Sequence, residues 1–138
     1  MRKDKLLTVK LKMKIMNDKK NFLKDKSFRL AVRTYKLYKY LTETKKEYIL
    51  SKQLLRSGTS IGANVREANN ASSKPDFINK LAIAQKETDE TLYWLELLNE
   101  VILLTRKEFD SIYAEAEELM KIIRSSILTA KKNLTKGK

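Results

Sequence analysis

Polar side chains that could do chemistry gather on two segments of the chain. The first group shares one helical face, because its members recur at steps of four, four and three: Arg56, Ser60, Asn64 and Glu67. The carboxylates of Glu87 and Glu90 would lie opposite this face if the two segments form a helical hairpin across Pro75. We predict an interhelical network in which Arg56 or Arg66 pairs with these carboxylates. Such pairs more often set the register between helices than perform catalysis.

Hydroxyl groups near this face could act as nucleophiles, but the sequence places no base beside them. The hydroxyls belong to Ser57, Thr59 and Ser60, and the chain contains neither histidine nor cysteine. Lys52 and Lys80 are expected to be ordinary solvated lysines. Because a nucleophile needs an adjacent base or another activating group, we expect a structural role for the hydroxyls and no enzymatic activity.

Carboxylates are plentiful in the second segment, where Asp89 lies between Glu87 and Glu90. Helical bundles that bind two iron or manganese ions combine inward-facing glutamates with Glu-x-x-His pairs. Since the chain has no histidine, solvated charges and ion pairs explain these residues better than a metal site. The stretch around Gly58 is also no phosphate-binding loop, because it lacks the Gly-Lys-Ser/Thr ending and continues a helical pattern. We therefore expect no metal and no cofactor.

The glycine-containing stretch between residues 53 and 68 continues a helical apolar stripe. Apolar and small residues recur there at steps of three and four: Leu50, Leu54, Ser57 or Gly58, Ile61, Val65, Ala68 and Ser72. Each glycine inside a helix costs about 1 kcal/mol relative to alanine. Gly58 and Gly62, four residues apart, therefore predict a close approach of a second helix that returns more than this cost.

Helical periodicity covers the chain from residue 25 onward. The patterns predict four helices, over about residues 25–41, 46–71, 75–104 and 109–134. The expected N-caps are Asp25 or Ser27, then Ser73 ahead of Pro75, then Thr105 with Glu108. Four helices with short connectors should pack as an all-α, antiparallel, up-down-up-down four-helix bundle over residues 25–134, followed by a basic tail at 135–138.

Residues 1–24 lie outside this pattern and form a basic N-terminal extension. Alternate residues are apolar, which favours a short strand: Leu7, Val9, Leu11, Met13 and Ile15. An unfolded extension fits equally well, and Met13 or Met16 could be the true start of the chain. No apolar run approaches the roughly 20 residues of a membrane span, and lysines interrupt any signal-like segment. We expect a cytoplasmic protein.

Positive charge is unevenly distributed along the chain. Thirty basic residues oppose 17 acidic ones, for a formal net charge of +13. Residues 1–26 hold ten basic and three acidic side chains, a net of +7, and the remainder contributes the other +6. A basic stripe follows the outer face of the first predicted bundle helix: Arg29, Arg33, Lys36 and Lys39. Such a stripe neutralises phosphates without reading sequence, although a solvated helix face explains any single member at least as well.

Several motifs resemble a known family. They are Phe28-Arg29-Leu30-Ala31 and the runs from Leu54 to Ala68, Asp76 to Leu81 and Ile83 to Leu95. They resemble the bacterial four-helix-bundle family named for proteins encoded by intervening sequences in 23S ribosomal RNA genes, over residues 27–130. The resemblance implies a pentameric barrel without enzymatic activity. That family is similar to the accessory variability determinant of diversity-generating retroelements, which binds nucleic acid and a reverse transcriptase. By that analogy the candidate phosphate contacts are Arg29, Arg33, Lys36, Lys39 and Arg56.

Two functions compete on these grounds. The first is a non-enzymatic homo-oligomer, a pentamer by resemblance, that binds RNA or DNA non-specifically through basic surface residues. The second is a structural adaptor that docks a partner protein, either near Tyr93 and Trp94 or on the rim of a ring. An enzyme is a third reading, and it would need a solvent-open pocket lined by Arg56, Glu87 and Glu90.

Overall fold

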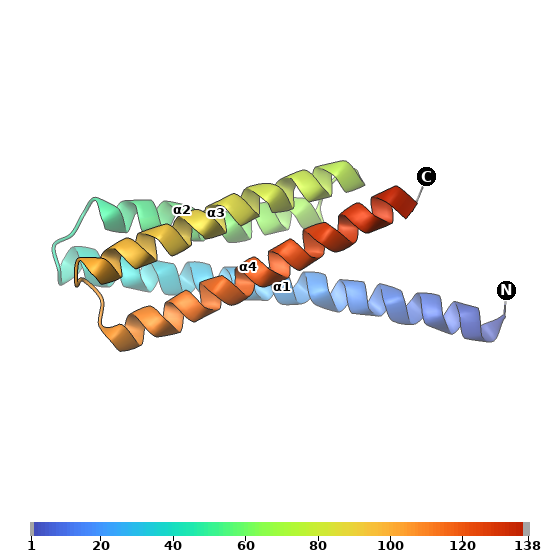
Figure 1. Ribbon diagram of the computed structural model, residues 1–138, viewed down its shortest axis with the longest axis horizontal. Coiled ribbons are helices and arrows are strands. Elements are labelled where there is room, and N and C mark those ends of the chain that lie inside the picture. Colours follow the sequence, from blue (N-terminus) through green and yellow to red (C-terminus); the bar gives the residue numbers. More distant parts are fainter. Residues whose placement is uncertain (1, 137–138) are drawn as a thin grey trace.

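Four helices make up most of the structure, a computed structural model that describes residues 2–136 (Figure 1). They are α1 (Lys3–Glu43), α2 (Leu50–Asn69), α3 (Lys74–Glu100) and α4 (Arg106–Lys136). The described residues contain no β-strand. The protein is therefore all-α, as the sequence predicted. No described helix combines the length and the apolar character that crossing a lipid bilayer requires.

Each helix packs against its neighbour in the chain, and α1 also contacts α4. In Figure 1 the chain reverses direction at each short connector, which is compatible with the predicted up-down-up-down bundle. The core between the helices contains fully buried aliphatic side chains from all four of them, including Leu30, Leu54, Ile61, Leu81, Leu95 and Leu119. Because burying each such side chain contributes about 1.5–3 kcal/mol, this core holds the helices together.

Helix α1 begins far ahead of the start expected from the sequence. It runs without interruption from Lys3 to Glu43, so the prediction of a strand or an unfolded extension is wrong for the described part of residues 1–24. Asp25 and Ser27 lie inside this helix and are not N-caps. The sequence also carries a helical pattern here, since four apolar residues recur at steps of three and four, in register with the face that α1 buries further along: Leu6, Val9, Met13 and Met16.

The first part of α1 forms an arm outside the bundle. Every residue from 2 to 18 is exposed, and Figure 1 shows this end of α1 extending beyond the other three helices. We refer to residues 3–18 as the N-terminal arm. At the other end of the chain α4 reaches Lys136. The basic tail predicted at 135–138 therefore starts within a helix, and its residues 137 and 138 lie outside the described part.

The predicted start signals of the last two helices are present. The Ser73 side chain accepts a hydrogen bond from the Asp76 N–H at 3.2 Å, and Pro75 occupies the first turn of α3. The Thr105 hydroxyl accepts a hydrogen bond from the Glu108 N–H at 3.1 Å. These side chains satisfy N–H groups that have no partner within the first helical turn.

Helix α2 begins at Leu50, later than predicted, because Glu47 organises its first turn. The Glu47 carboxylate accepts hydrogen bonds from the N–H groups of Ile49, Leu50 and Ser51 at 3.0, 2.7 and 2.8 Å. Burial raises the pKa of Glu47, but these N–H groups together lower it by more, so it lies below its ordinary value.

Gly58 lets α2 approach α1 closely. A Cβ atom at position 58 would lie 2.6 Å from Thr34 Cγ2 and 2.7 Å from Thr34 Oγ1. At position 62 the nearest atom to such a Cβ would be the Ser27 backbone oxygen, at 3.4 Å. Thr34 and Ser27 are both fully buried. The geometry at Gly58 fits the predicted close approach, and the second helix is α1, whereas a methyl group at Gly62 would meet only ordinary contacts.

Candidate nucleic-acid interface

Two members of the basic stripe on α1 are engaged in ion pairs. Arg33 lies 2.9 Å from the Glu115 carboxylate of α4, and its guanidinium also donates a hydrogen bond to Ser111 Oγ at 2.7 Å. Lys39 lies 2.6 Å from the carboxylate of Glu43, one turn further along α1. The hydrogen bond and the charge of Glu43 raise the pKa of Lys39. A phosphate would have to compete with these carboxylates for either cation.

The other two members of the stripe point into solvent. Arg29 and Lys36 are exposed, and neither forms an ion pair with any residue in the described part of the chain. Their seven-residue spacing places them on the same side of α1, about 10 Å apart along the helix axis. These two cations can therefore bind an anion without losing an internal partner.

Arg29 also borders a polar groove between α1 and α2, formed by two cavities that share Lys24 and Arg66. The larger cavity has a volume of about 460 Å³. The residues that line the two cavities are four cations, four amides, one aromatic ring and one acid: Lys20, Lys24, Arg29, Arg66, Asn17, Asn21, Asn69, Asn70, Phe28 and Asp25. We call this surface the α1–α2 groove.

The chemistry of the α1–α2 groove suits a nucleic acid. Phe28 is 56% exposed, and the Arg66 guanidinium lies 5.7 Å from the centre of its ring. Cations bind phosphates, amide groups hydrogen-bond to base edges, and an exposed aromatic ring can stack on an unpaired base. The groove brings all three kinds of group together.

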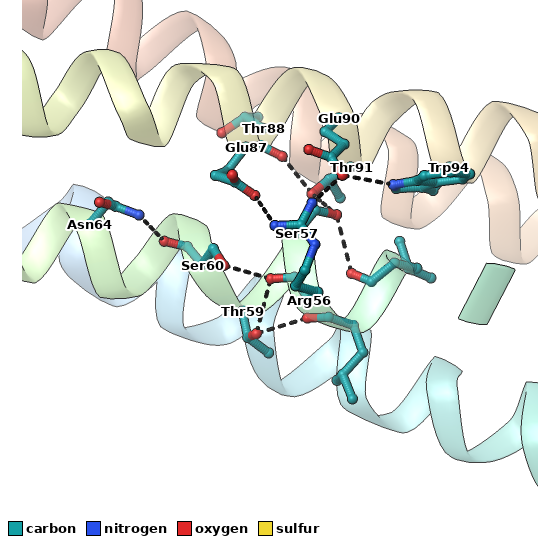
Figure 2. Close-up of polar contacts among 12 residues, drawn as sticks. Arg56, Ser57, Thr59, Ser60, Asn64, Glu87, Thr88, Glu90, Thr91 and Trp94 are labelled. Carbon is teal, nitrogen blue, oxygen red and sulfur yellow. Dashed lines mark hydrogen bonds and ion pairs between the residues drawn. The ribbon is translucent and has the colours of Figure 1, made fainter. Parts of the chain in front are cut away.

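Arg56 connects α2 to α3 through two carboxylates (Figure 2). Its guanidinium lies 3.3 Å from the Glu87 carboxylate and also hydrogen-bonds to Glu90. The Trp94 indole N–H donates to the same Glu90 carboxylate at 3.2 Å. The hydrogen bond from Arg56 lowers the pKa of Glu90 against the effect of burial, and the pair in turn raises the pKa of Arg56. Tyr93, beside this pair, is 56% exposed.

The other polar residues predicted in this network bond elsewhere. The Ser60 hydroxyl donates to the Arg56 carbonyl oxygen at 2.7 Å, and the Asn64 amide donates to the Ser60 carbonyl oxygen at 2.9 Å, both within α2 (Figure 2). Glu67 pairs with Lys80 of α3 at 3.2 Å. The structure thus joins Arg56, Glu87 and Glu90 into one cluster and leaves Ser60 and Asn64 outside it.

The hydroxyls and carboxylates near Arg56 take part in hydrogen bonds and ion pairs between helices. The buried hydroxyls of Ser57 and Thr91 lie 2.9 Å apart and link α2 to α3. Arg56, Glu87 and Glu90 are paired with one another, which speaks against the open pocket that an enzyme would need. Among residues 2–136 no group of three or more acidic side chains is arranged to hold a metal ion.

Comparison with known proteins agrees with this architecture. The family model described as 23S rRNA-intervening sequence protein matches residues 19–125. The chain belongs to the 23S rRNA-intervening sequence protein family. It is also similar to the crystal structure of a protein with unknown function from the S23 ribosomal protein family of Bacteroides thetaiotaomicron. The identity is 54%, the match covers 79% of this chain and 97% of the other, and the TM-score is 0.78. No curated protein matches the chain.

Sequence reasoning on this intervening-sequence protein missed the α1–α2 groove. Lys20 and Lys24 lie within the predicted N-terminal extension, residues 1–24, whereas Arg66, Asn69 and Asn70 lie at the end of α2. These residues meet only because α1 continues as a helix past the end of α2. The signal that could have found them is the pattern of mostly apolar residues at steps of three and four from Leu6 to Leu41, which continues through Lys20, Ser27 and Thr34.

Proposed function

We propose that the protein is a non-enzymatic, cytoplasmic homo-oligomer, a pentamer of up-down-up-down bundles, that binds RNA or DNA without sequence specificity. The α1–α2 groove is the proposed contact surface, together with Arg29 and Lys36. Arg33, Lys39 and Arg56 are left out of it, because each is already paired with a carboxylate. Family membership supports the bundle, but a family name that records gene location does not establish a role on the ribosome.

The observation that carries this proposal is the composition of the α1–α2 groove. Its lining has four cations against one acid, and the amides and Phe28 add groups that can contact bases. A surface selected only for solubility has no need of an exposed aromatic ring beneath a guanidinium. In a ring of identical subunits the groove would be repeated, which would increase the local positive potential.

The test is a set of binding curves for labelled single-stranded and double-stranded RNA and DNA, measured by fluorescence anisotropy over a range of salt concentrations. Binding should weaken steeply with salt, because each neutralised phosphate releases counterions. Substituting Lys24→Gln and Arg66→Gln together should weaken binding about tenfold and reduce the salt slope by about 2. Lys107→Gln, an exposed lysine on α4, is the matched control and should leave binding unchanged.

Salt-independent binding, or an equal loss in the Lys107→Gln control, would contradict the assignment of the groove. Light scattering measures the assembly independently. A mass equal to that of a single chain would contradict the homo-oligomer, whatever the outcome of the binding curves.

A further inference from the structure

A coiled-coil seam runs along the whole of α1. Apolar or small residues recur at alternating steps of three and four, with Lys20 as the single charged member: Leu6, Val9, Met13, Met16, Lys20, Leu23, Ser27, Leu30, Thr34, Leu37 and Leu41. In heptad terms these are the a and d positions, with Leu6 at a. A strict pattern of this kind is typical of a helix that packs along its full length against a partner helix.

The bundle covers only part of this seam. From Leu23 to Leu41 the a and d side chains are buried or half-buried, because α1 packs here against α2 and α4. On the N-terminal arm the same positions are open: Leu6, Val9, Met13 and Met16 are 43%, 47%, 58% and 47% exposed. Lys20, at the boundary, already belongs to the covered part, since its ammonium lies 5.2 Å from the Phe77 ring of α3.

A cavity of about 300 Å³ marks the place where the covered seam meets the open seam. It lies between α1, the turn from α2 to α3, and the C-terminal part of α4. Its floor includes the buried side chains Leu23 and Ala68, and Met16 and Phe77 line it as well. The charged residues in its lining are Lys19, Lys20 and Lys74, with no carboxylate among them. The apolar surface of the arm therefore continues into the end of the bundle.

The charges beside the seam specify the kind of helix that would fit it. Positions e and g flank a coiled-coil seam and select the partner by charge. Between residues 3 and 26 all but one of them are lysine, the exception being Asn17: Lys3, Lys10 and Lys24 at e, and Lys5, Lys12, Lys19 and Lys26 at g. The three acidic residues of this segment, Asp4, Asp18 and Asp25, all occupy position f, on the side facing away from the seam.

Inside the bundle, acidic side chains of α4 form ion pairs with basic residues at g positions of α1. At g positions of α1, Lys26 pairs with Glu118 and Arg33 pairs with Glu115, each at 2.9 Å. Further along α4 the match ends, because Lys19 meets Ser125 Oγ at 3.0 Å. Beyond Glu118 the charged residues of α4 are all basic: Lys121, Arg124, Lys131, Lys132 and Lys136. Beside the arm, therefore, the described part of α4 offers the lysines no carboxylate.

We propose that the open seam of the N-terminal arm, with the adjoining cavity, is the docking site for an acidic amphipathic helix of a partner protein. The partner presents apolar residues at its own a and d positions and glutamate or aspartate at e and g. The acidic residues of the partner pair with lysines of the arm in the same way that Glu115 and Glu118 of α4 pair with Arg33 and Lys26 further along α1. A second copy of the arm does not fit, because two such seams would bring lysine against lysine. Its cavity borders the α1–α2 groove, with which it shares Lys20 and Asn69, but the open seam of the arm from Leu6 to Met16 lies outside the groove, and the proposal does not depend on nucleic-acid binding.

The test uses synthetic three-heptad peptides and the full-length protein. The probe peptide has leucine at a and d and glutamate at e and g. A second peptide has lysine at e and g, and a third keeps the glutamates but has serine at a and d. Fluorescence anisotropy should show binding of the first peptide alone. Equal binding of the serine peptide would mean attraction by charge only, and would overturn the proposal.

Variants of the arm locate the site. Met13→Asp, at an a position, should weaken binding of the probe peptide at least about tenfold. Leu11→Asp is the matched control, because it places the same charge on the same arm at position f, and it should bind nearly as well as the parent. Both residues lie outside the bundle, so circular dichroism and the unfolding temperature should match those of the parent protein. Equal losses in the two variants would overturn the proposal.

A charge exchange gives the sharpest outcome. Replacing Lys5, Lys12 and Lys19 by glutamate should abolish binding of the glutamate peptide and create binding of the lysine peptide. Retention of the original preference would show that these positions do not face the partner helix. Salt-dependent binding of nucleic acid through the α1–α2 groove should survive Met13→Asp, so failure of this proposal and failure of the proposed function are distinguishable.

Discussion

Gly58→Ala should destabilise the bundle, although alanine is the better helix former. Alanine at an interior helical position gains about 1 kcal/mol over glycine. Against this gain, the new methyl group would lie 2.6 and 2.7 Å from the two γ atoms of Thr34. Thr34 is fully buried, and its hydroxyl donates to the Leu30 carbonyl oxygen at 2.7 Å, so turning the side chain away breaks a hydrogen bond. Overpacking costs about 1–3 kcal/mol, and we expect the upper end of that range.

The net loss should therefore be about 1–2 kcal/mol, or a fall of about 3–6 °C in Tm. Urea unfolding followed by circular dichroism measures it, at one protein concentration because assembly adds stability. Gly62→Ala is the matched control. Its methyl group would meet only ordinary contacts at 3.4–3.5 Å around Ser27, so this variant should gain up to about 1 kcal/mol.

The two substitutions should thus move stability in opposite directions. In a Thr34→Ala background both γ atoms are gone and only the Cβ atom of residue 34 stays close, at 3.0 Å, so Gly58→Ala should cost about 2 kcal/mol less than in the parent protein. A Gly58→Ala variant as stable as the parent, or an effect independent of Thr34, would refute the reasoning that a tight crossing requires this glycine.

Three further substitutions test other contacts by urea unfolding. Glu47→Ala removes the acceptor of three N–H groups at the start of α2 and should cost about 1–2 kcal/mol at neutral pH. Because the pKa of Glu47 is lowered in the folded protein, this stabilisation should be present above about pH 4.3 and should disappear as the pH falls through the folded pKa. Glu90→Gln should cost only about 0.5–1 kcal/mol, since the pair with Arg56 is partly exposed. The difference in stability between variant and parent should vanish in the same acidic range, and a difference that stays unchanged there would contradict the pairing. Ile102→Gly should raise stability by about 0.5–1 kcal/mol. Ile102 is 82% exposed and adopts a φ of 60° just after α3, where a β-branched side chain is strained. A loss of stability would show instead that the Ile102 side chain makes a stabilising contact.

The contacts that the sequence predicted best are those whose register is set by a short turn. Arg56 and Glu90 are each 17 residues from Ser73, so a hairpin across that turn necessarily brings them to the same level. Gly58 was equally informative, because a glycine on the apolar face of a helix loses stability unless another helix packs closely against it; the same inference fails for Gly62, where a methyl group would fit. The sequence could not say that the helix approaching Gly58 is α1, since contacts between non-adjacent segments depend on how the helices pack.

The N-terminal segment was misjudged because two periodicities coexist in it. Leu7, Val9, Leu11, Met13 and Ile15 alternate strictly, while Leu6, Val9, Met13 and Met16 follow helical steps. Only continuity with the buried face of α1 decides between them, and that continuity becomes visible when the whole helix is considered. The late start of α2 had a different cause, because a glutamate three residues before the helix is a less familiar cap than serine, threonine or aspartate.

Helix α1 has neither glycine nor proline between Lys3 and Glu43, so nothing in its sequence provides a hinge. A rise of 1.5 Å per residue gives the 17 exposed residues from 2 to 18 a length of about 25 Å. A partner helix bound to the arm would therefore lie at a fixed distance and angle from a nucleic acid bound at Arg29 and Arg66. One uninterrupted rod would serve as a spacer between two bound molecules, and inserting a single residue near position 18 would rotate one of them by about 100° relative to the other.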